Sequence, residues 1–92
     1  MTENNTIYII FRRAYHEDDL DYGTFKPFYI SLNLERVTNV FNNLCNNITR
    51  DPLAENIKEI LLTSIEYYRK HWYYEFRLER YELDKFCTFE KK

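Results

Sequence analysis

The spacing of the apolar residues changes along this chain, and that change limits the possible folds more than any other feature of the sequence. Residues 7–11 carry apolar side chains on both faces of an extended run, which predicts a central β-strand. From Asn33 the apolar residues recur every three or four positions, which predicts a helix capped by Ser31 or Asn33. Residues 72–78 alternate between apolar and polar, which predicts a half-buried strand. Two different periods in one short chain predict an α+β domain.

A second strand is predicted at residues 24–31, directly before the helix. Pro27 has no backbone N–H to donate, so we expect this strand at an edge of the sheet. The acidic loop, residues 16–23, joins it to the first strand and closes a hairpin. Gly23, the only glycine in the chain, can supply the positive φ that a turn often requires.

A second helix is predicted to begin at Asp51 and Pro52, because Asp is a good N-cap residue and Pro is favoured at the first helical position. Basic residues at 69–71 would complement the dipole at its C-terminus. Its apolar face would comprise Leu53, Ile57, Ile60, Leu61, Ser64, Ile65 and Tyr68. The predicted architecture is a two-layer α+β domain of order β-β-α-α-β, with two helices on one face of a three-stranded sheet. The strand order would be 2-1-3, with the third strand parallel to the first.

Phe41 is one of the predicted core residues. It lies on the apolar stripe of the first helix, so we expect its ring to be buried against the sheet. The residues expected to pack with it are Leu44, Ile57, Ile60 and Leu61 in the helical layer and Ile9 and Phe11 in the first strand.

The last strand changes parity after Leu78, because the next apolar residues fall on the other face. One explanation is a β-bulge near Glu79 and Arg80 that redirects the chain. The other is that Tyr81 and Leu83 face outward toward a partner. The bulge is the interpretation we favour.

Composition restricts the function classes. A length of 92 residues predicts a single domain, residues 1–92, and no apolar run approaches the roughly 20 residues of a membrane span. Polar residues follow Met1, so we expect no signal peptide and a cytoplasmic protein. Cys45 and Cys87 would then stay reduced, with Cys45 as a small core residue. A net charge of −2 is too balanced for a general nucleic-acid binder. No catalytic or metal-binding motif occurs, so we expect no enzymatic activity, no cofactor and no metal.

Eight candidate residues for binding a partner fall into three groups. They are Tyr73, Arg77, Tyr81, Asp18, Asp19, Asp21, Asn39 and Asn43. The first group would line the outer face of the last strand, where Tyr and Arg are typical interface anchors; the alternative is an ordinary amphipathic strand. The aspartates would attract a basic partner; the alternative is a solvated loop. The asparagines belong to a charge-free stripe of the first helix; the alternative is the codon usage of an AT-rich genome.

Two segments support a resemblance to known proteins: residues 29–31 running into a helix, and the closing segment 80–84. This pattern looks like that of small phage and mobile-element proteins. Size, AT-rich composition, missing catalytic motifs and surplus aromatic residues also resemble anti-CRISPR and related anti-defence inhibitors. The resemblance implies a small inhibitor or adaptor that binds a protein stoichiometrically, and it transfers no functional residue. The alternatives are a nucleic-acid-binding regulator that uses sheet aromatics with Arg12 and Arg13, and a homodimeric structural module.

Overall fold

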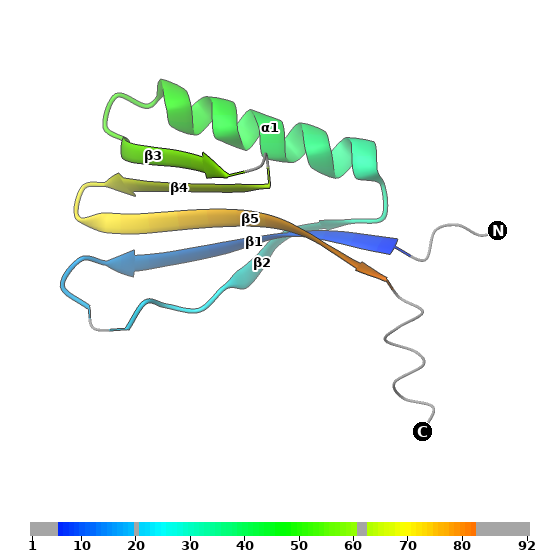
Figure 1. Cartoon of the computed structure of the whole chain (residues 1–92), viewed down its shortest axis with the longest axis horizontal. Coiled ribbons are helices and arrows are strands. Elements are labelled where there is room, and N and C mark those ends of the chain that lie inside the picture. The colour runs from blue at the N-terminus through cyan, green and yellow to red at the C-terminus, as the bar shows by residue number, and fades with distance from the viewer. Residues whose placement is uncertain (1–5, 20, 61–62, 83–92) are drawn as a thin grey trace.

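The computed structural model describes residues 6–19, 21–60 and 63–82, which form five strands and one helix. Figure 1 shows their arrangement. The elements are β1 (Thr6–His16), β2 (Lys26–Ser31), α1 (Leu34–Arg50), β3 (Glu55–Ile60), β4 (Ser64–Arg69) and β5 (Trp72–Glu82).

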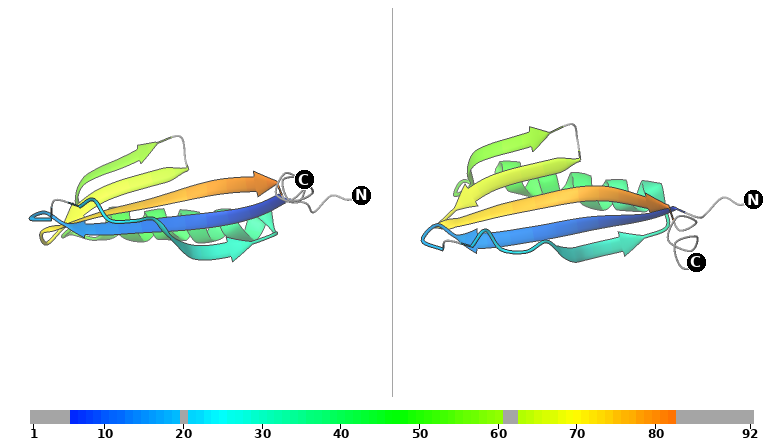
Figure 2. Two further views of the ribbon diagram at one scale, coloured as in Figure 1. Left: turned by 90° about the horizontal axis from the view of Figure 1, so that it is seen from below. Right: turned by 60° about the horizontal axis from the view of Figure 1, so that its bottom comes forward.

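All five strands form one antiparallel sheet in the order β2-β1-β5-β4-β3. β1 and β5 form its central ribbon, paired without interruption from Thr6 opposite Glu82 to His16 opposite Trp72. The helix lies along one face of the sheet, as the two views of Figure 2 show. No described helix or strand covers the other face, although Phe25 and Tyr22 of the segment before β2 pack against part of it, and we call it the open face. Its strand residues are Ile7, Ile9, Phe11, Arg13 and Tyr15 of β1, Tyr73, Glu75, Arg77, Glu79 and Tyr81 of β5, and Ser64, Glu66 and Tyr68 of β4.

The first helix is confirmed. Asn33 is its N-cap, and the Asn33 side chain accepts a hydrogen bond from the backbone N–H of Arg36 at 3.0 Å. Buried residues recur on its inner side at the expected spacing, and Phe41 is 2% exposed. Cys45 is half-buried and packs against this core as a free thiol. The helix therefore follows directly from the local pattern.

The core lies between α1 and the covered face of the sheet. Its fully buried members are Ile10, Val37, Phe41, Ile48, Ile65 and Phe76. The prediction that Phe41 packs over Ile9 and Phe11 is wrong, because β1 turns Tyr8 and Ile10 toward the helix. Both faces of β1 are apolar, so only the sheet contacts decide which set faces the helix. The side chain of Ile60, together with Leu61, Leu83 and Cys87, lies outside the described residues.

The second predicted helix is wrong. Residues 55–69 form the hairpin of β3 and β4, and Asp51 ends α1 instead of starting another helix. The Asp51 carboxylate accepts a hydrogen bond from the backbone N–H of Leu53 at 2.9 Å and bonds Arg69 at 2.7 Å. The basic residues expected at a helix end belong instead to β4 and the β4–β5 turn, where Lys70 and His71 have φ of 50° and 76°.

β-Branched and aromatic residues explain this outcome. Within β4, Ile65 and Tyr67 face the helix while Glu66 and Tyr68 face outward, which is strand alternation. The helical spacing groups Ile65 with Tyr68 and leaves Tyr67 off the apolar face, whereas the strand groups Ile65 with Tyr67. The β4–β5 turn also lacks the Asn-Gly or Asp-Gly pair typical of two-residue hairpins, so the sequence gives no sign of it.

The predicted topology fails with the helix, since β5 runs antiparallel to β1 in a sheet of five strands rather than three. The favoured bulge in the last strand is also wrong, because β5 keeps its register with β1 past Glu79. Two local predictions are confirmed. β2, which contains Pro27, is an edge strand, and Gly23 has a φ of +78°. A Cβ atom at Gly23 would lie 2.8 Å from the carbonyl oxygen of Ala14, so the turn also requires a residue without a side chain.

Candidate binding surface on the open face

Strand register places three tyrosines side by side on the open face. Tyr73 of β5 lies opposite Tyr15 of β1 and Tyr68 of β4. The ring centroids of Tyr15 and Tyr73 are 5.1 Å apart and stacked, and those of Tyr68 and Tyr73 are 4.8 Å apart. Tyr22 of the acidic loop packs edge-on against Tyr15 at 5.2 Å. Aromatic pairs at these distances stabilise neighbouring strands beyond the area they bury. We call Tyr15, Tyr73 and Tyr68 the tyrosine row.

The next register position carries charged residues across four strands. Arg13, Glu75, Glu66 and Lys58 lie opposite one another in turn, on β1, β5, β4 and β3. We call these four residues the charged row. Glu75 is only 5% exposed, although it lies on the open face. A buried carboxylate is costly unless it is paired, so its partners must be part of the fold.

Two arginines supply those partners. Arg13 donates to Glu75 Oε1 at 2.5 Å and Arg77 donates to Glu75 Oε2 at 2.8 Å. Both guanidinium carbons lie 4.6 Å from the ring centroid of Phe25, which the chain places over this part of the sheet. The bonded carboxylate raises the pKa of Arg77. Cation–π contact and carboxylate pairing therefore hold the two guanidinium groups in place.

A groove of about 430 Å³ opens beside these residues. The tyrosine row and the charged row line it, together with Tyr67, Tyr74 and the bulged segment of β3 at residues 56–57. The bulge is visible in the register, since Glu55 pairs with Tyr68 but Lys58 pairs with Glu66, and Asn56 has a φ of 54°. Glu66 is half-buried in this groove, whereas Lys58 on the edge strand is exposed.

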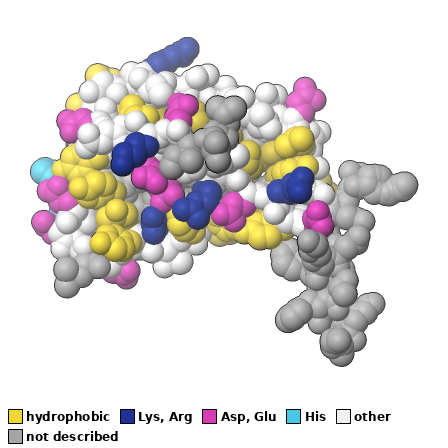
Figure 3. Space-filling model, viewed as in Figure 1, with side chains coloured by type: hydrophobic (Ala, Val, Ile, Leu, Met, Phe, Trp, Pro, Cys, Tyr) yellow, Lys and Arg dark blue, Asp and Glu magenta, His cyan; other side chains and the backbone are white. Residues whose placement is uncertain are grey.

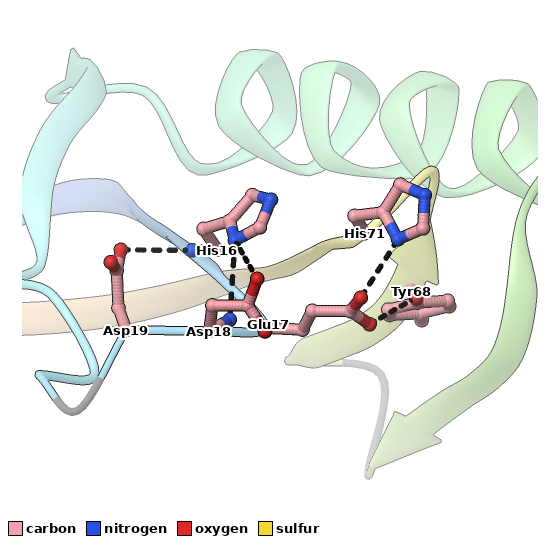
Figure 4. A network of polar contacts seen from close by, with 6 residues as sticks. All are labelled: His16, Glu17, Asp18, Asp19, Tyr68 and His71. Atoms are coloured by element: carbon pink, nitrogen blue, oxygen red, sulfur yellow. Dashed lines mark hydrogen bonds and ion pairs between the residues drawn. The ribbon is translucent and has the colours of Figure 1, made fainter.

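The acidic loop is held against the β4–β5 turn at one end of the tyrosine row, as Figure 4 shows. The Glu17 carboxylate accepts a hydrogen bond from the Tyr68 hydroxyl at 2.5 Å and lies 2.8 Å from Nδ1 of His71. The Glu17 backbone N–H donates to the His71 carbonyl at 2.8 Å. These contacts lower the pKa of Glu17, and the bond to Glu17 raises the pKa of Tyr68 to about 12. The loop therefore helps to fix the ring at the end of the row.

Apolar side chains gather toward both ends of the face in Figure 3, with basic and acidic side chains between them. At one end lies the tyrosine row. At the other, Phe11 packs edge-on against Tyr81 at 6.3 Å, and the Tyr81 hydroxyl donates to Glu79 at 2.5 Å. That bond raises the pKa of Tyr81. The open face is therefore amphipathic along its length.

The structure distributes the eight predicted binding residues over three places. Tyr73, Arg77 and Tyr81 share the open face, but eight positions of strand separate the two tyrosines, or about 26 Å. The aspartates are exposed in the acidic loop, and the two asparagines are exposed on α1, across the sheet from the open face. One flat partner surface cannot contact the open face and the asparagines together.

Sequence reasoning missed Tyr15, Tyr68 and Glu66 as residues of this face. Tyr15 continues the alternation of β1, which is the signal that could have placed it. Tyr68 and Glu66 were hidden by the incorrect helix. Among the described residues, His, Cys, Asp and Glu side chains do not gather in threes as a metal site would require.

Comparison with known proteins returned no relative: no family model, no curated protein and no solved structure matches this chain. Within the part of the chain that the structure describes, the helix is too short or too polar to cross a membrane.

Proposed function

We propose that this protein binds another protein through its open face and acts as a stoichiometric inhibitor or adaptor. The observation that carries the proposal is the sheet face that no described element covers, with Tyr73 at 39% exposure in the middle of the tyrosine row. Exposed aromatic groups on a rigid sheet lose little conformational entropy on binding, which suits them as anchors. A host defence complex is the first partner class to test, because the size and composition resemble those of anti-defence inhibitors.

Charge favours a protein over a nucleic acid as the partner. Glu66, Glu75 and Glu79 share the open face with its arginines, and both Arg13 and Arg77 are bonded to Glu75. Phosphate contacts need basic groups that are available, so this face offers a poor path for a nucleic-acid backbone.

The sheet edges favour a face over an edge as the binding surface. β2 carries Pro27 and a bulge next to it, and β3 carries a bulge at Asn56 followed by Lys58 and Glu59. Bulges, prolines and charges are features that discourage strand addition. Pairing of two copies through an exposed edge is therefore the weaker alternative.

Affinity capture from host lysate with two matched double variants tests the proposal. We expect Tyr73→Ala with Tyr81→Ala to abolish capture of a partner that the wild-type protein retains, since a hot-spot aromatic contributes roughly 2 kcal/mol or more. Asn39→Ala with Asn43→Ala alters the outer side of α1 and should leave capture unchanged. Amide spectra or melting curves confirm that each variant is folded.

Arg77 is unsuitable for this test, although it was a predicted anchor. Its removal would leave the buried Glu75 with one partner and weaken the fold itself. The proposal is overturned if the folded tyrosine variant captures the same partner as the wild type, or if only the asparagine variant loses it.

A further inference from the structure

Glu66 differs from the other carboxylate of the charged row. Glu75 is bonded by two arginines, whereas Glu66 makes no hydrogen bond or ion pair with any residue that the structure describes. Lys58 lies directly across from it on β3, yet the two side chains form no ion pair. A half-buried carboxylate in a groove, without a bonded cation, is a ready acceptor for one.

The groove places aromatic rings next to that carboxylate. Tyr68 is two residues from Glu66 on the same strand face, and Tyr73 lies across from Tyr68 with its ring 4.8 Å away. A cation in contact with Glu66 can therefore also meet the face of a tyrosine ring, and the two attractions add. Glu66 would repel an anionic ligand. Arg13 donates one Nη to Glu75, and its Nε, which is unpaired within the described residues, is buried, so it is not exposed to an incoming anion.

We propose that this groove receives an arginine side chain of the partner protein, with Glu66 pairing the guanidinium group and the tyrosine row contacting its plane. This inference rests on the proposed function, because it assigns the chemistry of the partner to the same face. Arginine fits better than lysine, since its planar fork can bind a carboxylate through two hydrogen bonds and stack on an aromatic ring.

The molecule already uses this arrangement once. Arg13 and Arg77 bond one carboxylate and lie over one aromatic ring, that of Phe25. Glu66 with Tyr68 and Tyr73 offers the same pair of groups without the guanidinium. The acidic loop adds exposed negative charge near Tyr68 at the end of the tyrosine row, where Figure 4 shows Asp18 and Asp19 beside Glu17. Asp21 is a further exposed carboxylate of the same loop. A basic partner segment is therefore complementary to both the groove and its surroundings.

Titration with a short probe tests the inference. The probe is the acetylated and amidated peptide Gly-Gly-Arg-Gly-Gly, with citrulline and lysine versions, added to the full chain and followed by amide chemical shifts. We expect the arginine peptide to change the amide chemical shifts of Glu66, Tyr68 and Tyr73. The citrulline peptide, which lacks the charge, should leave these chemical shifts unchanged. The lysine peptide should bind more weakly than the arginine peptide.

Two substitutions identify the groups that bind the probe. Glu66→Gln keeps the shape of the side chain and should weaken binding of the arginine peptide by up to about fivefold, as expected for a partly exposed ion pair. Glu59→Gln alters an exposed carboxylate on the neighbouring strand and should change nothing. Tyr73→Leu, which keeps an apolar side chain but removes the ring, should also weaken binding and decides the matter if Glu66→Gln does not fold.

The inference is overturned if the citrulline peptide binds as well as the arginine peptide, if no groove residue shifts, or if Glu66→Gln binds the probe unchanged. Its failure is distinct from failure of the proposed function. If the tyrosine double variant loses the partner but the peptide does not bind, the open face is still the interface. Only the inference that the groove receives an arginine is then rejected. If the peptide binds but the open-face variants capture the partner as the wild type does, both the proposed function and the arginine inference are rejected.

Discussion

Phe41 of α1 is buried in the core between the helix and the sheet, and its burial makes a sharp prediction. Phe41→Ala should lower the free energy of unfolding by about 3–5 kcal/mol, because it removes a buried ring and leaves a cavity. Chemical denaturation followed by circular dichroism measures the change. Asn42→Ala, at the next and exposed position, is the matched control and should alter stability by less than about 0.5 kcal/mol. An unchanged midpoint for Phe41→Ala would contradict the packing described here.

Glu75 shows the limit of reasoning from single residues. Its place in an alternating strand predicts an exposed carboxylate, yet it is buried because Arg13 comes from β1 and Phe25 from the segment before β2. Neither neighbour is close to it in the sequence. The burial of a charge is a property of its partners, and those are fixed only when the strands pair.

The junction between the acidic loop and the β4–β5 turn makes a prediction at the scale of elements. Hydrogen bonds from Tyr68 and His71 lower the pKa of Glu17 below its ordinary value of about 4.5. A carboxyl with a lowered folded pKa stabilises the fold fully above its ordinary pKa, and this contribution is lost as pH falls through the lowered value. We expect Glu17→Gln to lower the melting temperature at pH 7 and to reduce its dependence on pH below about pH 4.5.

Melting curves between pH 2.5 and pH 7 provide the measurement, with Glu59→Gln as the control for removing one exposed acidic group. The loss in Glu17→Gln should be largest at neutral pH and should shrink toward the acid end. A Glu17→Gln curve parallel to that of the wild type at every pH would show that this contact does not couple protonation to folding.

The hairpin of β3 and β4 shows why an element can be mistaken when its boundaries are unmarked. Residues 53–68 satisfy a helical spacing. The alternation that marks a strand is confined to residues 64–67, where Ile65 and Tyr67 alternate with Ser64 and Glu66. Non-glycine residues occupy the positive-φ positions of the following turn. Pairing of β4 with β5 satisfies backbone groups along an otherwise open edge of the central ribbon, and that pairing selects the strand.

The distribution of charge over the whole molecule makes a prediction about association. The three aspartates of the acidic loop are exposed, so in the proposed complex they would attract a basic partner at long range. Replacing Asp18, Asp19 and Asp21 by Asn should slow association with the captured partner about threefold to tenfold at low salt. The dissociation rate should hardly change. Because exposed charges are screened within about 8 Å at physiological ionic strength, the effect should fade as salt is added.

Association and dissociation rates, measured with the partner immobilised on a sensor surface at two salt concentrations, distinguish electrostatic steering from direct contact. A triple variant that dissociates faster at both concentrations would place the aspartates in the interface itself. Equal association rates for the wild type and the triple variant at low salt would reject electrostatic steering by the loop.

The sequence by itself determined the features that depend on neighbours along the chain: a helix that begins near Asn33, the hairpin of β1 and β2, the positive φ of Gly23, and an edge strand at Pro27. It did not determine where that helix ends, since the sequence indicates a break at residues 46–50 and the structure continues α1 to Arg50. The open-face position of Tyr73 also followed from alternation, whereas that of Tyr81 contradicts the bulge favoured from the sequence. Only the tertiary structure decided which apolar face of β1 meets the helix, whether residues 55–69 are helical, and which side chains join Tyr73 and Glu75. The physical reason is that strand pairing joins residues far apart in sequence, so the groove and its rows exist only once the register is set.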